Sequence, residues 1–226
     1  MQIFIPATIF QCKISKNELI SKYRTLHITK EYVVFTNAKV MIKAYCNNID
    51  LACDEINLDF CELKNLIKVG KKSGEISFFI DNIKENEAEI TRKSSKEVIK
   101  GRVRTYKTYL DYNALYDNFD FYHKITLSKD FSKLSLFCNA NKTIKFENNL
   151  ITAKLGNARI AKQSESLENT QLNGLKIALS TNNNSMITLD TNKEATWYFK
   201  NESSPYRIMQ YDLENTLDII EMPIAL

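Results

Sequence analysis

The sequence contains few residues that interrupt regular secondary structure. Only five of its 226 residues are glycine and three are proline, a composition that argues against a low-complexity or loop-built protein. There is no run of 18 apolar residues, so no membrane span is expected. The first residues, Met1–Pro6, are too short for the apolar core of a signal peptide. We therefore expect a cytoplasmic protein with no membrane partner.

Cysteine and histidine are also scarce. The five cysteines are odd in number, and the closest pair, Cys46 and Cys53, is seven residues apart, which matches no metal site. Without an export signal, we expect them to be reduced thiols. His27 and His123 are the only histidines, and neither lies in the context of a catalytic triad. The glycines form no phosphate-binding loop. The sequence therefore predicts no enzyme, no cofactor and no metal site.

The charge is mildly basic. The formal net charge is +4 and the sequence pI is about 8.6. This balance is compatible with a nucleic-acid partner, but a chain rich in Lys, Asn and Ile is equally expected from a genome of biased composition. Hydrophobic residues make up 44% of the chain and charged residues 26%, which is typical of folded globular domains.

Strand-like segments dominate the first half of the chain, with β-branched or aromatic residues between polar turns. They are Gln2–Ile5, Thr25–Thr29, Tyr32–Thr36, Val40–Tyr45, Glu55–Phe60, Glu75–Asp81, Glu87–Arg92 and Val98–Tyr106. Two helices are expected between them. Residues 8–22 form the first, with Thr8 as its N-cap, and residues 61–69 form the second, with apolar residues at helical spacing.

The second half repeats this order. Strands are expected at Lys124–Leu127, Thr143–Glu147, Leu150–Leu155, Ala158–Gln163, Leu175–Ser180, Ala195–Asn201, Tyr206–Tyr211 and Leu217–Pro223, helices at Lys129–Cys138 and Asn184–Asp190, and a polar loop at 164–172. Strand, helix and three strands thus occur four times. The sequence predicts an α+β fold of two domains, 1–107 and 123–226, each a twofold repeat of this unit. The aromatic segment 108–122 is expected to be a packed connector, since flexible linkers are polar.

The C-terminal segment Ile219–Leu226 carries apolar residues on either side of a Met-Pro pair. Proline lacks the N–H that a central strand needs, so an edge strand is expected here. An alternative is that this tail forms one wall of a peptide-binding groove.

These features together resemble the DNA sliding clamps, the ring-shaped processivity factors of replicative polymerases, and in particular the beta subunit of bacterial DNA polymerase III. The tail Ile220–Leu226 is similar to the closing strand of that family, which ends Met-Pro-X-Arg-Leu, with Ala225 where the family has Arg. The junction Tyr109–Leu115 is similar to the Phe-Pro-Asp-Tyr segment that joins the second and third domains. Thr36–Met41 stands where the family has Thr-Asp-Gly-His-Arg-Leu, and only the Thr is kept.

The resemblance implies helices on one face of curved antiparallel sheets, with no chemistry performed by the protein. Bacterial clamp chains have three domains and this sequence has two, as if the first were absent. A ring of twelve helices would then need three copies, a homotrimer if the ring closes. The implied partners are double-stranded DNA, and DNA polymerase and the clamp loader through a short linear peptide. Two alternatives stay open: a clamp-derived protein-interaction module that does not encircle DNA, and a β-rich protein of unrelated function.

Two sets of site residues follow. A ring must attract phosphates without reading bases, so helical lysines are the candidate DNA contacts: Lys13, Lys16, Lys64, Lys68, Lys71, Lys72, Lys129 and Lys133. The same pattern is expected of any surface helix in a lysine-rich protein. The resemblance maps the partner-peptide groove to Thr36, Val40, Met41, Met222, Pro223, Ile224 and Leu226. A further basic stretch from Arg92 to Arg104 alternates with apolar residues and is typical of the solvated face of a sheet.

Overall fold

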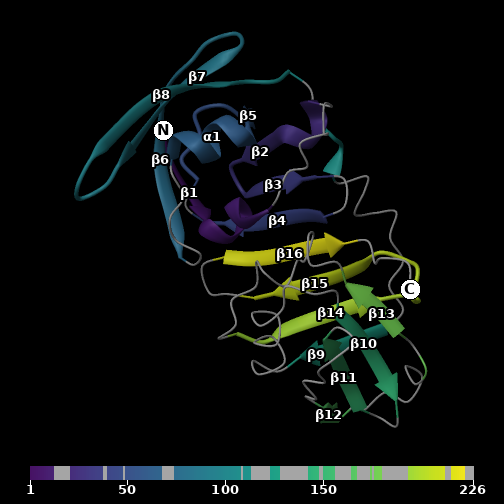
Figure 1. Ribbon diagram of the computed structural model, residues 1–226. Helices are drawn as coiled ribbons and strands as arrows, with labels where there is room; N and C mark the ends of the chain where they lie inside the picture. The colour runs from purple at the N-terminus through teal and green to yellow at the C-terminus, as the bar shows by residue number, and fades with distance from the viewer. Residues whose placement is uncertain are drawn as a thin grey trace. The chain divides into compact units, whose positions relative to one another are not determined.

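The protein consists mostly of antiparallel β-strands with few helices (Figure 1). The computed structural model describes residues 1–12, 21–37, 40–47, 49–67, 74–107, 109–112, 123–127, 142–147, 150–155, 164–166, 174, 176–179, 193–211 and 215–221. The chain divides into two compact units. One unit comprises Met1–Ala114 and Asp212–Leu217, and the other comprises Leu115–Tyr211 and Asp218–Leu226.

The first unit contains an antiparallel sheet in the order β1-β6-β7-β8. Its strands are β1 (Gln2–Pro6), β6 (Glu75–Ile83), β7 (Glu87–Lys93) and β8 (Val98–Arg104). One face of this sheet is apolar, because Ile80, Ala88, Ile90 and Val103 are all buried. Of the residues that alternate with them, Thr91 is buried and the others are exposed or half-buried, so the opposite face of the sheet is largely solvated.

Four further strands of this unit follow one another in the order β5-β2-β3-β4. They are β2 (Thr25–Thr29), β3 (Tyr32–Thr36), β4 (Val40–Cys46) and β5 (Glu55–Asp59). Apolar residues pair across them in register, as Leu26 does with Phe35 and Phe35 with Ile42. These three side chains are fully buried. β2 and β3 have the bounds that the sequence predicted.

The helix α1 (Phe60–Ile67) covers this core. Its buried residues Phe60, Leu63 and Ile67 recur at helical spacing, and the Phe60 ring stacks on Phe35 at 3.9 Å and on Phe10 at 5.5 Å. The predicted helix 61–69 is therefore confirmed over its described part. It begins one residue earlier than predicted, and the preceding strand ends at Asp59 instead of Phe60.

The predicted helix at 8–22 is wrong in its described parts. These are 3-10 turns, η1 (Ala7–Gln11) and η2 (Ser21–Arg24), and residues 13–20 lie outside the description. The cap position of η1 is Pro6, without a side-chain cap, so Thr8 is not an N-cap. At the end of the turn, the N–H of Cys12 donates to the Ile9 carbonyl at 3.3 Å. This three-residue bond is the tighter pattern of a 3-10 turn.

The second unit contains an antiparallel sheet in the order β12-β11-β10-β13 and strands in the order β16-β15-β14-β9, with β16 belonging to this unit from Asp218 onward. The strands are β9 (His123–Leu127), β10 (Lys142–Glu147), β11 (Leu150–Leu155), β12 (Ser164–Ser166), β13 (Lys176–Leu179), β14 (Ala195–Phe199), β15 (Tyr206–Gln210) and β16 (Asn215–Glu221). β12 corrects the predicted polar loop at 164–172 over its first three residues, where Glu165 pairs with Ile151 of β11; residues 167–172 lie outside the described residues. The predicted strand 158–163 and helices 129–138 and 184–190 lie outside the described residues.

Within the ranges given above, no helix is both long and apolar enough to cross a membrane.

Candidate functional site

The helix α1 begins at a buried carboxylate. Asp59, the last residue of β5, accepts a hydrogen bond on Oδ1 from the backbone N–H of Glu62 at 2.9 Å. This is the bond of a helix N-cap, which satisfies a donor at the first turn and places negative charge at the positive end of the helix. Asp59 therefore explains why the strand stops and the helix starts at this point.

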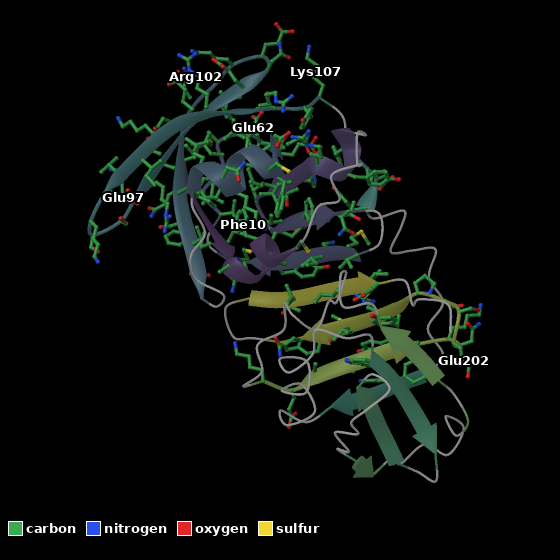
Figure 2. All side chains as sticks on the ribbon, in the orientation of Figure 1. Phe10, Glu62, Glu97, Arg102, Lys107 and Glu202 are labelled. Atoms are coloured by element: carbon green, nitrogen blue, oxygen red, sulfur yellow. The ribbon has the colours of Figure 1, made fainter. Side chains whose placement is uncertain are left out.

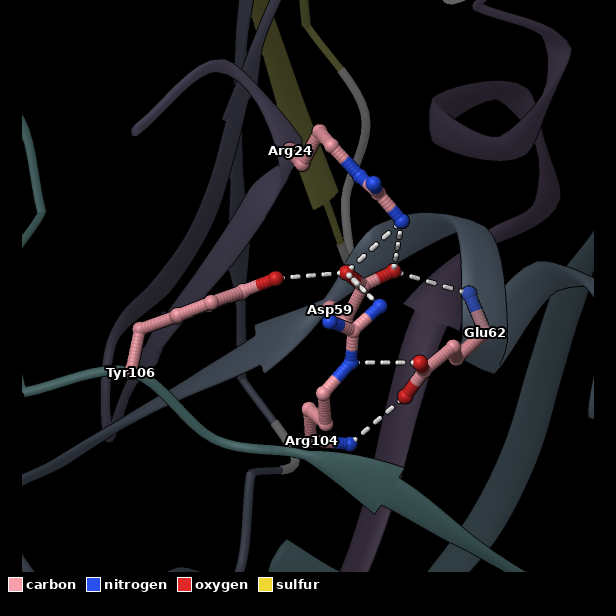
Figure 3. A network of polar contacts seen from close by, with 5 residues as sticks. All are labelled: Arg24, Asp59, Glu62, Arg104 and Tyr106. Atoms are coloured by element: carbon pink, nitrogen blue, oxygen red, sulfur yellow. Dashed lines mark hydrogen bonds and ion pairs between the residues drawn. The ribbon is translucent and has the colours of Figure 1, made fainter. Parts of the chain in front are cut away.

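Asp59 is also the centre of a polar network (Figure 3). Its carboxylate lies 3.0 Å from Nη2 of Arg24 and 3.6 Å from Nη2 of Arg104, and it accepts a hydrogen bond from the Tyr106 hydroxyl at 2.6 Å. Arg104 also donates from Nε to Glu62 at 2.6 Å. Burial, together with the bond to Asp59, raises the pKa of Tyr106 to about 12. The network connects η2, β5, α1 and β8, whose residues are far apart in the sequence.

Lys64 is the one predicted DNA-contacting lysine that the described residues include. Its Nζ donates to the carbonyl of Cys12 at 3.1 Å and lies 5.7 Å from the centre of the Phe60 ring. The side chain is half-buried, and this burial lowers its pKa. Lys64 thus connects α1 to Cys12, the C-cap residue of η1, through a hydrogen bond. The exposed residue on this stretch of α1 is Asn65.

The C-terminal end of α1 is held by β7 and β8. Arg92 donates from Nη1 to the carbonyl of Ile67, where a cation complements the negative end of the helix. Leu66 packs against Gly101 of β8, and a Cβ at Gly101 would lie only 2.5 Å from Leu66 Cδ1. The absence of a side chain at Gly101 therefore sets how closely the helix approaches the sheet.

The basic stretch of β7 and β8 is divided between the two faces of its sheet. Arg92 reaches α1, whereas Lys93, Lys100 and Arg102 are exposed. Acidic side chains share their face, and Arg102 lies 3.5 Å from Glu87. An open cavity of about 540 Å³ lies here, lined by Lys93, Lys100 and Arg102 together with Asp81, Glu89, Ile90, Thr91 and Gly101. The solvated sheet face that the sequence predicted is thus of mixed charge.

Hydrogen bonds join the end of β3 to the start of β4. The Thr36 hydroxyl donates to the Val40 carbonyl at 2.9 Å, and the Asn37 side-chain oxygen accepts from the Val40 N–H at 2.9 Å. Thr36, Val40 and Met41 are buried, as is Asn37. These bonds hold Thr36 and Asn37 to Val40, so the three groove residues predicted here lie on hydrogen-bonded strand ends.

The first residues of the connector pack on the strands of the first unit. The Tyr109 ring stacks on the His27 ring at 4.0 Å, and His27 Nδ1 lies 2.8 Å from the Asn57 side-chain oxygen. His27 is 1% exposed, and burial lowers its pKa, although the Asn57 bond and nearby Glu55 oppose that effect. Tyr112 is buried beside them, at 5.8 Å from His27. His27 is a packing residue that lies directly opposite Asn57 on the neighbouring strand, and no local sequence pattern signals this pair.

The remaining predicted site residues lie outside the description, and their roles stay predictions. They are Lys13, Lys16, Lys68, Lys71, Lys72, Lys129 and Lys133 of the DNA-binding set, and Met222, Pro223, Ile224 and Leu226 of the groove. Among the residues that the structure does describe, no group of three or more His, Cys, Asp or Glu side chains could hold a metal ion.

The arrangement of strands and helix matches solved structures along the whole chain. The beta subunit from DNA polymerase of Streptococcus pyogenes superimposes with a TM-score of 0.67, covering 100% of this chain and 66% of that chain, at 15% identity. The chain has the fold of a bacterial sliding clamp. The DNA polymerase sliding clamp from Bacillus subtilis superimposes with a TM-score of 0.65 at 16% identity. The match covers 100% of this chain and 64% of that chain. The Helicobacter pylori beta clamp in complex with diflunisal superimposes with a TM-score of 0.67 at 17% identity. The match covers 97% of this chain and 62% of that chain.

The resemblance predicted from the sequence is confirmed by these clamp structures at the level of the fold. The chain spans about two thirds of the length of the clamp chains that it matches. No protein-family model matches the sequence, and no curated protein matches it.

Proposed function

We propose that the protein is a sliding clamp or a clamp-like processivity factor, which encircles duplex DNA and tethers a polymerase or other replication proteins. The observation that supports this proposal most strongly is the clamp fold over the whole length of the chain. In this proposal three copies form the ring, and the protein performs no chemistry of its own.

The mechanism is topological. A ring that surrounds DNA keeps a bound polymerase near the primer end after each dissociation, so rebinding becomes an intramolecular event with a high effective concentration. The ring must attract phosphates and still slide, so we assign its inner surface to helical lysines, which contact phosphates without reading bases. Lys68, Lys71 and Lys72 are the candidates next to α1, because Lys64 is already bonded to Cys12.

Partners are proposed to bind through a short linear peptide with Leu and Phe anchors. The groove assigned to it comprises Thr36, Val40 and Met41 with the tail residues Met222, Pro223, Ile224 and Leu226. The hydrogen bonds that join Thr36 and Asn37 to Val40 support this assignment, because backbone that is already held in place loses little conformational entropy when a peptide binds. A few buried anchors then suffice for useful affinity.

Retention on DNA of different topology tests the ring. Protein loaded onto a nicked circular plasmid should stay bound through gel filtration in moderate salt, and cutting the plasmid once should release it. This release distinguishes a ring from a protein that binds DNA by charge alone, because charge binding is the same on circular and linear DNA. Equal loss from both forms would contradict encirclement.

The alternative function is a clamp-derived interaction module that binds partner peptides without encircling DNA. The bond of Lys64 to Cys12 favours this alternative, because it removes one lysine from the set available to phosphates. Peptide binding without topology-dependent retention on DNA would support the module and contradict the ring.

A further inference from the structure

The solvated face of the β1-β6-β7-β8 sheet is hollowed by the open cavity of about 540 Å³. Thr91 of β7 contributes to its lining and is only 2% exposed, although it lies on this face. The register sets Thr91 between Phe79 of β6 and Lys100 of β8, whose longer side chains surround it. Small-molecule sites have volumes of about 300–1,000 Å³, so the cavity is large enough for a small ligand.

Two lysines in the wall of the cavity are available to such a ligand. Lys93 and Lys100 are exposed, and neither forms an ion pair with any residue that the structure describes. The Lys93 ammonium group instead lies 4.8 Å from the centre of the Phe79 ring. Arg102 adds a third positive charge, because it lies 3.5 Å from Glu87 and is still 64% exposed. Figure 2 shows Arg102 projecting away from the core of the unit.

The carboxylates of the cavity wall are already engaged with other groups. Asp81 accepts a hydrogen bond from the Thr91 hydroxyl, and Glu89 lies 3.1 Å from the Lys84 ammonium group. Positive charge therefore remains at the end of the cavity that Lys93 and Lys100 form. A carboxylate has room for several hydrogen bonds, so Asp81 and Glu89 still offer acceptors to neutral donor groups of a ligand.

The three cations form a row across β7 and β8. Lys93 pairs in register with Val98, so Lys100 is its diagonal neighbour, at about 7–8 Å between backbone positions. Lys100 and Arg102 are alternate residues of one strand and are about 7 Å apart. A single phosphate can contact one pair of these side chains, whereas a chain of linked phosphates can contact all three. The row therefore matches a polyphosphate better than an isolated anion.

The acidic residues argue against a nucleic-acid backbone at this place. A duplex presents phosphates along its whole length, and some of them would face Asp81 and Glu89. A nucleotide instead carries its negative charge at one end, and its sugar and base supply hydroxyl and amino donors at the other. Its two ends thus match the basic and the acidic part of the cavity.

We propose that this cavity binds a nucleoside polyphosphate, with its phosphate chain on Lys93, Lys100 and Arg102 and its nucleoside toward Asp81 and Glu89. All of these residues belong to the first unit. The site does not depend on the function proposed above, because a ring that encircles DNA and a module that binds only peptides would both carry it.

Calorimetric titration of the full chain with ATP tests the site, without magnesium so that the phosphates keep their charge. ATP should bind the wild type, and inorganic tripolyphosphate and adenosine should each bind more weakly, because each lacks one half of the ligand. Lys93→Gln with Lys100→Gln should weaken ATP binding about tenfold or more, since two charge-assisted contacts are lost. Both side chains are exposed, so the variant should stay folded, which circular dichroism verifies.

A matched control removes two positive charges outside this sheet. Lys30→Gln with Lys124→Gln changes the net charge equally at two exposed lysines and should leave ATP binding unchanged. No binding by the wild type at millimolar ATP, or unchanged binding by the folded Lys93→Gln, Lys100→Gln variant, would overturn the site. Tripolyphosphate that binds as tightly as ATP would overturn the assignment to a nucleotide. Displacement of ATP by a short DNA duplex would also overturn it and would identify this face as a nucleic-acid contact.

Discussion

At the scale of single residues, the stability of the first unit depends strongly on Asp59. This carboxylate caps α1 and is the shared partner of Arg24, Arg104 and Tyr106. Its side chain is fully buried, so Asp59→Ala removes both the cap of α1 and the acceptor that Arg24 and Tyr106 share. We expect the free energy of unfolding to fall by about 3 kcal/mol, measured by urea denaturation with circular dichroism.

Asp54 provides the control for this change. It forms an exposed ion pair with Lys30 at 3.1 Å, and exposed pairs contribute about 0–1 kcal/mol. Asp54→Ala should therefore change the free energy of unfolding by no more than about 1 kcal/mol. Equal decreases for the two variants would show that the network around Asp59 contributes no more than a surface pair.

His27 should make stability depend on pH. Burial lowers its pKa below 6.5 in the folded state, so the unfolded chain binds a proton that the folded chain does not. The contribution of neutral, buried His27 to the free energy of unfolding is fully present above the pKa of the unfolded chain. It is lost as the pH falls below 6.5 toward the pKa of the folded chain. Burial is the largest cause of the lowered pKa; Lys43 lowers the pKa further, whereas the bond to Asn57 and the charge of Glu55 raise it, and the Tyr109 ring stacks on the imidazole.

The measurement compares the wild type with His27→Phe, which keeps an aromatic ring against Tyr109 but cannot titrate. Between about pH 7.5 and pH 5.5, the free energy of unfolding of the wild type should decrease more than that of the variant. Parallel pH profiles would mean that His27 has the same pKa in the folded and unfolded chain.

At the scale of secondary-structure elements, Gly101 determines how α1 packs on its sheet. An added methyl group would lie 2.5 Å from Leu66 Cδ1, so Gly101→Ala should destabilise the protein by about 1–3 kcal/mol through overpacking. Leu66→Ala removes the colliding group. In a double-mutant cycle, Gly101→Ala should lower the free energy of unfolding clearly less in the Leu66→Ala background than in the wild type. Additive effects would show that the strand itself, and not the helix contact, requires glycine.

The elements differ in how well the sequence predicted them. β2 and β3 have their predicted bounds, because alternating apolar residues end at polar turns. The helix at 8–22 was wrong at its start, because Ala7, Ile9 and Phe10 are all buried in a 3-10 turn whose spacing resembles that of an amphipathic helix. β12 was missed because Ser164–Ser166 has the composition of a loop and is a strand through its pairing with β11.

The candidate site was less predictable than the strands. Arg24, Tyr106 and Arg104 meet Asp59 from positions 35 to 47 residues away in sequence, so no local pattern signals the network. Helical spacing placed Lys64 on a polar face. It could not indicate that the ammonium group reaches the carbonyl of Cys12, 52 residues earlier in the chain.

At the scale of the whole molecule, the affinity for DNA should depend on salt through the helical lysines. Removing one lysine–phosphate interaction should reduce the slope of log affinity against log salt by about one. Lys68→Glu with Lys71→Glu should therefore lower the slope, whereas Lys64→Met should change it little, because Lys64 already bonds Cys12. Fluorescence anisotropy with a labelled duplex measures this dependence. An unchanged slope in the double variant would mean that these lysines are ordinary solvated residues.

We expect the tail residues 222–226 to be required for peptide binding but not for folding. The described strand β16 ends at Glu221, so deletion of residues 222–226 leaves it whole, and the thermal transition should persist. Binding of a fluorescent peptide with Leu and Phe anchors should disappear, because the deletion removes apolar residues that would bury those anchors. As a control, Ala225→Arg restores the charge found in the clamp family and should strengthen binding of an acidic version of the peptide. Full binding by the truncated chain would refute the groove, and loss of folding would identify the tail as an edge strand that closes the core.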